Sequence, residues 1–231
     1  MKTLSGIVLL IILVVATNLQ AGNNFCGELD RDRYGPYDYT NAKNRERIAL
    51  VERRHFTSYK NLIGNTGSIA ANFSYTLNAF PNHHPALIAM GKLSLREKTV
   101  RPLGATYPVE CYFDRAIRFK PGDGIVRMIY GNYLLKLGGR SDDAIEQYHE
   151  AVRLQPENAN INYNIGLMYL KKKDYELAIV HAKKAYELGF PLLGLRNKLM
   201  KIGKWDGKLD EEVREDADGN IDEKIDVEPQ K

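Results

Sequence analysis

Three histidines are the residues of this chain whose types most readily suggest catalysis or metal binding. His83 and His84 are adjacent in the sequence, and His55 lies upstream of them. Adjacent side chains point in different directions on a helix or a strand, so this pair is poorly placed to hold one metal ion. No histidine pair at i, i+4 spacing, cysteine–histidine cluster, nucleophile elbow, phosphate loop or dinucleotide fingerprint accompanies them. We therefore predict no metal, no cofactor, no catalytic residue and no enzyme activity. The alternative is a metal-dependent enzyme that uses these three histidines.

Two cysteines offer a different chemistry, the formation of a disulfide. Cys26 and Cys111 are the only cysteines among the 231 residues. In an oxidising compartment they can pair, which would close a loop of about 85 residues and contribute up to ~4 kcal/mol in the chain-entropy model. We predict this disulfide. The alternative is two unpaired thiols, one of them buried against a helix neighbour.

The first residues indicate export. After Met1 and Lys2, the segment Gly6–Ala16 is purely apolar, but it is shorter than the about 20 residues of a membrane span. We predict a signal peptide over residues 1–21, cleaved after Ala21. The alternative is an uncleaved N-terminal anchor, and only in that case would the chain contact a membrane. We expect an exported protein, located in a bacterial periplasm.

The last residues are strongly acidic. Residues 204–231 contain eleven acidic and five basic side chains and almost no apolar periodicity, which predicts a disordered acidic tail. Within it, Asp216–Asp222 is similar to the middle of a calcium-binding loop. However, Arg214 and Ile225 occupy the first and twelfth loop positions, where oxygen ligands are needed. A solvated tail is therefore favoured over a calcium site.

The middle of the chain repeats one pattern at an interval of 35 residues, from Gly131 to Gly166. In each copy a glycine is followed by small residues, and a proline ends the unit. The first copy contains Gly131, Ala144, Tyr148, Ala151 and Pro156, and the second contains Gly166, Tyr169, Ala178, Ala182, Ala185 and Pro191. Small residues at this spacing let two antiparallel helices approach closely, and proline cannot continue a helix.

This pattern resembles the tetratricopeptide repeat (TPR) family, whose period is ~34 residues, with Gly139 as the extra residue. The resemblance implies an all-α fold, a right-handed α-solenoid of about three to four helical hairpins with a C-terminal capping helix. The clearest repeats are residues 122–156 and 157–191, the degenerate repeats are 42–81 and 82–121, and the capping helix is 192–202. These units form a helical domain over residues 42–203, and an irregular arm, residues 22–41, precedes it.

Three further segments are similar to a smaller group within that family. They begin at Tyr34 (YGPYDY), Phe80 (FPNHH) and Glu110 (ECYFDRAI). The group consists of small exported bacterial TPR-containing proteins of unassigned function. This resemblance agrees with the expected export and implies nothing about mechanism.

In the TPR family the first helix of each hairpin lines a concave groove that accepts a peptide or a partner helix. Mapped onto this chain, the resemblance implies a groove formed by Ile88, Lys92, Arg96, Met128, Asn132, Leu135, Lys136, Asn160, Tyr163, Asn164, Leu167 and Lys171. Asn132 and Asn164 match two asparagines of the carboxylate clamp found in chaperone-binding members. However, Met128 and Gly194 stand where that clamp needs cations. We therefore favour ordinary repeat positions for both asparagines.

The charge distribution favours an anionic partner. Residues 22–203 carry 27 basic and 18 acidic side chains, whereas the tail is acidic. The tail either screens this charge or lies across the groove until a partner displaces it. We predict a scaffold or adaptor that binds a protein or peptide partner in its concave groove during cell-envelope assembly. The alternative is a protein that holds an anionic envelope polysaccharide during its export. Nucleic acid is not expected, because the chain carries no nucleic-acid-binding motif.

Overall fold

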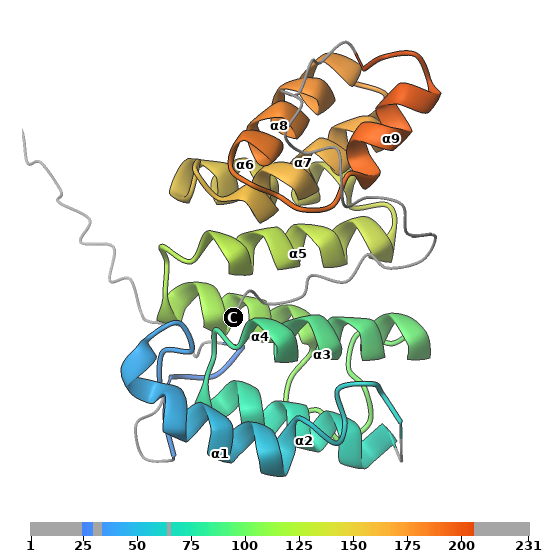
Figure 1. The fold of residues 1–231 in the computed structure, drawn as a ribbon. Helices are drawn as coiled ribbons and strands as arrows, with labels where there is room; N and C mark the ends of the chain where they lie inside the picture. Colours follow the sequence, from blue (N-terminus) through green and yellow to red (C-terminus); the bar gives the residue numbers. More distant parts are fainter. Residues whose placement is uncertain (1–24, 30–33, 64–65, 206–231) are drawn as a thin grey trace, which may run out of the picture.

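The computed structural model describes residues 25–29, 34–63 and 66–205, and every regular element in these ranges is a helix (Figure 1). The elements are the 3-10 helix η1 (Ala42–Asn44) and the α-helices α1 (Arg45–His55), α2 (Thr66–Ala79), α3 (His84–Glu97), α4 (Val109–Phe119), α5 (Gly124–Leu137), α6 (Ser141–Leu154), α7 (Ala159–Lys172), α8 (Tyr175–Glu187) and α9 (Gly194–Lys201). None of these helices combines the length and the apolar character needed to cross a bilayer.

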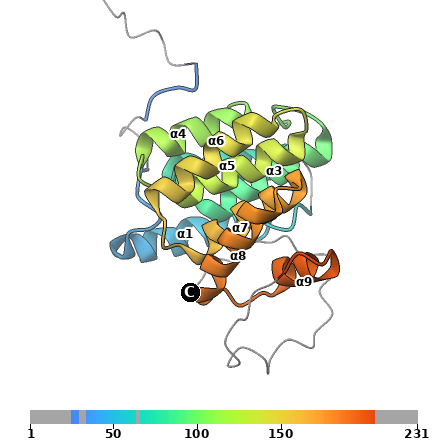
Figure 2. The same cartoon turned by 90° about the horizontal axis from the view of Figure 1, so that it is seen from above.

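The helices form four consecutive hairpins, α1–α2, α3–α4, α5–α6 and α7–α8, which stack in chain order (Figure 1). Helix α3 contacts α5, and α5 contacts α7, so the first helices of the last three hairpins lie beside one another. Helix α9 packs against α7 and α8, where the first helix of a further hairpin would lie (Figure 2). The predicted α-solenoid of helical hairpins with a C-terminal capping helix is therefore confirmed.

Polar side chains at the turns determine where several helices begin. Asp123 accepts a hydrogen bond from the backbone N–H of Val126 at the start of α5. Asn158 and Asp174 make the equivalent contact at the starts of α7 and α8. Each side chain satisfies one of the backbone donors that the first turn of a helix leaves unpaired. These turns, both within and between hairpins, are therefore encoded locally.

The small residues of the repeated pattern lie where helices approach most closely. A Cβ atom added to Gly131 of α5 would lie 3.1 Å from the carbonyl oxygen of Ala144 and from the ring of Tyr148, both on α6. A Cβ atom added to Gly166 of α7 would lie 2.6 Å from Cδ2 of Leu195 on α9. These distances are tighter than ordinary van der Waals contacts, so a larger residue at either position would force its neighbours to shift.

A continuous hydrophobic core runs through the stack from α2 to α9. Its fully buried members include Phe73 of α2, Phe113 of α4, Met128 of α5 and Leu195 of α9. A smaller second cluster contains Val51, Ala79 and Phe80, and the partly buried Tyr37, Tyr39 and Ile48 pack against it. The segment that precedes η1 therefore covers the apolar side of the first hairpin.

A disulfide joins Cys26 to Cys111 at the start of α4, with the two Cα atoms 4.9 Å apart. Hydrogen bonds reinforce this connection. Arg115 Nη1 donates to the carbonyl oxygens of Cys26 and Glu28, at 3.2 Å and 2.7 Å, and Arg118 Nη2 donates to that of Gly27 at 2.9 Å. The N-terminal segment is therefore fastened to the second hairpin both covalently and by charge-assisted hydrogen bonds.

Two predictions concern residues that lie outside the described part of the chain. The signal peptide was predicted for residues 1–21, and all but the first two residues of the acidic tail fall within 206–231. Both therefore stay predictions.

Loss of the disulfide is expected to lower the free energy of unfolding by about 4 kcal/mol, because the unfolded chain regains the freedom of a long loop. Urea unfolding of Cys26→Ser beside the oxidised native chain measures this loss. Reductant should destabilise the native chain by a similar amount and leave Cys26→Ser unchanged. If the oxidised native chain and the variant unfold at the same urea concentration, the disulfide does not stabilise the fold.

Candidate partner-binding groove

The first helices α3, α5 and α7 share a strip of half-buried apolar side chains. Each of these side chains packs partly against the core and leaves part of its surface accessible. The strip consists of Ile88 and Leu95 from α3, Ile125 and Leu135 from α5, and Leu167 and Leu170 from α7. We call it the first-helix face. Because the fully buried residues of the same helices point into the core, this strip is what the hairpin stack leaves for another molecule to contact.

A hollow of about 40 Å³ lies on this face between α3 and α5. Its lining residues are Leu87, Ile88, Gly91, Lys92, Leu95, Phe113, Ile129, Asn132, Tyr133 and Lys136. A Cβ atom on Gly91 would lie 3.2 Å from the ring of Tyr133, so the glycine lets α3 and α5 pack closely here. Most of the lining is apolar, with an amide and two lysines added. Such a surface can take up an apolar side chain and attract a carboxylate beside it.

The structure brings four of the predicted groove residues together in this hollow, namely Ile88, Lys92, Asn132 and Lys136. Three others, Leu135, Leu167 and Lys171, lie on the same helices with part of their surface exposed. Lys136 and Lys171 occupy equivalent positions of successive repeats, 35 residues apart. These seven residues are therefore accessible from one side of the stack or lie at its edge.

Met128 is a correction to the predicted groove. Its side chain is fully buried, with 0% of its surface exposed, and it belongs to the core cluster. One helical turn of α5 separates it from Asn132, which lies on the accessible side. Met128 therefore stabilises the stack and cannot touch a partner.

Asn132 and Asn164 bond within the protein. Asn132 Nδ2 donates to Asn164 Oδ1 at 3.4 Å, and the hydroxyl of Tyr148 donates to Asn132 Oδ1. Asn164, only 7% exposed, donates through Nδ2 to the carbonyl oxygen of Asn160 at 2.8 Å. These hydrogen bonds connect α5, α6 and α7 and satisfy polar groups that would otherwise be buried unpaired. Their hydrogen bonds therefore give both asparagines a structural role, and no carboxylate clamp is needed to explain them.

Tyr163 and Arg96, two further predicted groove residues, contact segments outside the first-helix face. The ring of Tyr163 stacks on Phe190, with centroids 4.0 Å apart, and its hydroxyl lies near Gly194 at the start of α9. Arg96 Nη1 donates to the carbonyl oxygen of Leu62 at 2.6 Å, so it fastens the end of α3 to the segment after α1. Both side chains bound the face and are not freely available on it.

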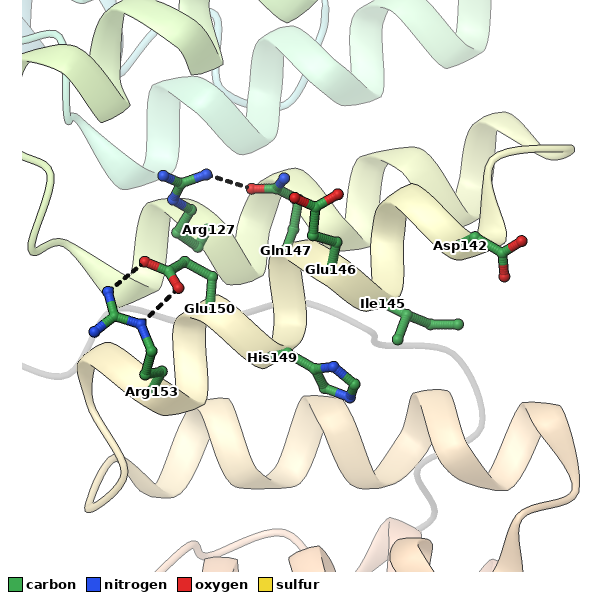
Figure 3. Close-up of a pocket in the computed structure, with 8 residues that line it drawn as sticks. All are labelled: Arg127, Asp142, Ile145, Glu146, Gln147, His149, Glu150 and Arg153. Carbon is green, nitrogen blue, oxygen red and sulfur yellow. Dashed lines mark hydrogen bonds and ion pairs between the residues drawn. The ribbon is translucent and has the colours of Figure 1, made fainter.

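A larger hollow, of about 490 Å³, lies on the exposed side of α6 and was not predicted (Figure 3). Its lining residues are Arg127, Asp142, Ile145, Glu146, Gln147, His149, Glu150 and Arg153. Two hydrogen bonds of 2.7 Å from Arg153 to Glu150 lower the pKa of that carboxyl group, and Arg127 Nη1 donates to Gln147 at 2.9 Å. The acidic residues of α6 are the only sequence signal for it. The hollow is open, and Arg153, one of its two cations, is already paired with Glu150, so we assign it no ligand.

The three histidines each have a structural partner. His83 is fully buried, its Nδ1 accepts the backbone N–H of Ala86 at the start of α3, and its Nε2 lies 3.0 Å from Glu52. His84 Nε2 lies 2.9 Å from Asp123, and His55 Nδ1 lies 2.7 Å from Asn72. Within residues 25–29, 34–63 and 66–205, no group of three or more histidine, cysteine or acidic side chains is placed to hold a metal ion.

His84 and Asp123 belong to a buried polar junction between the first three hairpins. Asn82 donates to both Asp38 and Asp123, and it accepts the backbone N–H of Tyr39 at 2.9 Å. Burial by itself raises the pKa of Asp123, but hydrogen bonds from His84 and Asn82 outweigh it and keep the pKa below its usual range. The junction therefore joins the segment before η1 to the starts of α3 and α5.

Comparisons with known proteins match the repeated part of the chain. The sequence matches two models of the tetratricopeptide repeat (TPR) family. One, described as TPR repeat, covers residues 133–173, and the other, described as tetratricopeptide repeat, covers residues 159–188. No curated protein matches it. Among solved structures, MamA MSR-1 C2 is similar at 18% identity and a TM-score of 0.37, covering 62% of this chain and 93% of that chain. A mutant form of MamA is similar at 18% identity and a TM-score of 0.36, covering 63% and 94%.

The stability of the fold is expected to fall as the solution becomes more acidic than about pH 6.5. Burial lowers the pKa of His83 below its ordinary 6.5, although Glu52 opposes this. The unfolded chain therefore binds a proton that the folded chain does not, and a one-proton difference lowers the free energy of unfolding by about 1.4 kcal/mol per pH unit. Urea unfolding at several pH values between about 7.5 and 5 measures this slope.

The variant His83→Asn should reduce that slope, because asparagine can still accept the N–H of Ala86 but does not titrate. Burial, followed by His149, also lowers the pKa of His181, so that histidine contributes in the same direction and part of the slope should persist. An unchanged slope in His83→Asn would show that His83 is not responsible. The carboxyl groups whose pKa is lowered, such as Asp38 with a pKa of about 2, affect the free energy of unfolding only in more acidic solution.

Proposed function

Residues 133–188 of this chain belong to the tetratricopeptide repeat family, whose members are scaffolds for protein interactions, and we therefore propose that the first-helix face binds a protein or peptide partner. The observation that carries the proposal is the strip of half-buried apolar side chains on α3, α5 and α7, with its hollow between α3 and α5. The protein acts as an adaptor and carries out no covalent chemistry.

The chemistry of the face indicates the kind of segment that it accepts. The apolar strip suits the apolar side of a helix or alternate side chains of an extended peptide. Cationic side chains lie at the C-terminal ends of α5 and α7, at Lys136 and Lys171. An acidic residue beside an apolar one in the partner would match this arrangement, so that apolar contacts supply affinity and charges orient the partner.

Replacing the apolar strip should weaken partner binding while the fold is kept. We expect Ile88→Ser, Leu135→Ser and Leu167→Ser, combined, to weaken binding at least about tenfold, because each removes a central apolar contact. Partners are first captured from cell envelopes with the native chain, and the affinity of each purified partner is then measured for both proteins. Circular dichroism checks that the variant is folded.

A matched control replaces three exposed apolar residues that lie away from the first-helix face. Leu177 and Val180 of α8 and Met200 of α9 are 39%, 58% and 51% exposed, and their serine variant should bind as the native chain does. Equal loss in both variants, or loss in neither, would contradict the assignment of the site.

The response to salt distinguishes this function from the alternative, in which the protein holds an anionic envelope polysaccharide. The aliphatic side chains of the apolar strip on the first-helix face favour a peptide. Raising the salt concentration to about 0.5 M should leave most of the partner affinity in place, whereas binding of a polyanion to lysines would be lost steeply. Steep loss would favour the polysaccharide.

We also propose that the protein works in the cell envelope after export to the periplasm. The disulfide between Cys26 and Cys111 supports an oxidising compartment, since such bonds rarely persist in the cytosol. Osmotic-shock fractionation should release the protein with the periplasm, and mass spectrometry should find Gly22 as its first residue. Recovery of the uncleaved chain with the membrane fraction would instead support an N-terminal anchor.

A further inference from the structure

Three consecutive lysines, Lys171, Lys172 and Lys173, form an exposed cluster where α7 ends and the turn to α8 begins. Lys173 has a left-handed backbone conformation, with φ 65°, and its N–H donates to the carbonyl oxygen of Leu170. Among the described residues none of the three forms an ion pair with an acidic side chain. The carbonyl end of α7 favours cations nearby but does not neutralise three of them. The lysine cluster is therefore a concentration of positive charge at the edge of the first-helix face.

The described part of the chain ends beside this cluster. After α9 the chain turns back, and the backbone N–H of Lys204 donates to the carbonyl oxygen of Leu199 at 2.9 Å. The ammonium group of Lys204 lies 5.5 Å from the ring centroid of Tyr175, the first residue of α8, two positions after Lys173. Trp205 contacts Tyr186 of the same helix, with centroids 6.1 Å apart. The described chain therefore ends, at Trp205, next to the α7–α8 hairpin.

The sequence that follows has the opposite charge. Residues 206–231 contain eleven acidic and four basic side chains, and four of the acidic residues fall between Asp206 and Glu212. Fully extended, a chain of 26 residues spans at most roughly 90 Å. Helix α3 is two helix spacings from α7, about 20 Å. The segment is therefore long enough to reach the lysine cluster and the whole first-helix face.

We propose that residues 206–231 bind within the same molecule to the lysine cluster and the adjoining first-helix face, and that a partner must displace them. The contact itself follows from charge complementarity and from the point where the segment begins; its regulatory effect rests on the proposed function. Because the segment is tethered, its effective concentration at the cluster is on the order of millimolar, so even weak attraction keeps the site covered. The segment then selects for partners that carry both acidic and apolar residues.

Amine labelling of the full chain tests the contact without any partner. A neutral-tail variant replaces the eleven acidic residues of 206–231 by their amides. At about 20 mM salt we expect Lys171, Lys172 and Lys173 to react at least about threefold more slowly in the native chain than in this variant. Lys43 is exposed in η1, which contacts α1 at the other end of the stack from α7 (Figure 1), and it should react equally in both. Mass spectrometry after limited reaction measures each rate.

Two further conditions make the outcome decisive. At about 0.5 M salt the difference should disappear, because screening weakens contacts between exposed charges. The protection should also be independent of protein concentration, since the contact is intramolecular. Equal labelling of the lysine cluster in the two proteins at low salt would overturn the proposal. Protection that rises with protein concentration would also overturn it and assign the segment to a second copy of the chain.

The partner measurement separates this inference from the proposed function. For a partner captured by the native chain, the neutral-tail variant should bind at least about tenfold more tightly at low salt. If the lysines are protected but no partner depends on the first-helix face, the contact stands and the adaptor function fails. If the partner depends on that face but binds the neutral-tail variant no more tightly, the regulatory role of residues 206–231 fails alone.

Discussion

Close contact between the two helices of a hairpin is the constraint on which the rest of this structure depends. Gly131 lies so close to α6 that an added Cβ atom would come within 3.1 Å of it, and Ala144, Ala178 and Ala182 are fully buried. Dispersion contacts weaken steeply with distance, so a hairpin held apart by larger residues would lose its packing. A close-packed hairpin has an apolar side that only the next hairpin can cover. The stack, its continuous core and its half-buried first-helix face all follow from this contact.

The second constraint is that buried polar groups need hydrogen-bond partners. It explains why several residues of types common in functional sites lie in the core. His83, Asn82 and Asn164 are all nearly inaccessible, and each forms hydrogen bonds with another element of the stack. A buried amide or imidazole without a partner is costly, whereas one that joins two helices fixes their relative position. The polar residues whose types most suggest catalysis or ligand binding therefore position the hairpins. The candidate binding surface, in contrast, is largely apolar.

The charges of the molecule are distributed unevenly, so the two edges of the first-helix face differ in charge. Cationic side chains gather at the C-terminal ends of α3, α5 and α7, where the helix dipoles favour them. Polar caps such as Asp123 and Asn158 stand at the opposite ends of these helices. An acidic segment, whether from a partner or from residues 206–231, is therefore drawn to one edge of the face. Attraction of this kind guides orientation and depends on salt, while burial of the apolar strip does not.

The sequence by itself determined the helical hairpins and their closest contacts, because small residues, helix caps and prolines act over a few residues and recur at a fixed interval. It also predicted that Ile88, Lys92, Asn132 and Lys136 would share a surface. Only the tertiary structure decided that Met128 is core and that Asn132 bonds to Asn164. Each residue turns a helix by about 100°, so a small rotation of α5 against its neighbours moves a side chain from groove to core. That rotation is set by packing among several hairpins, which no single repeat encodes.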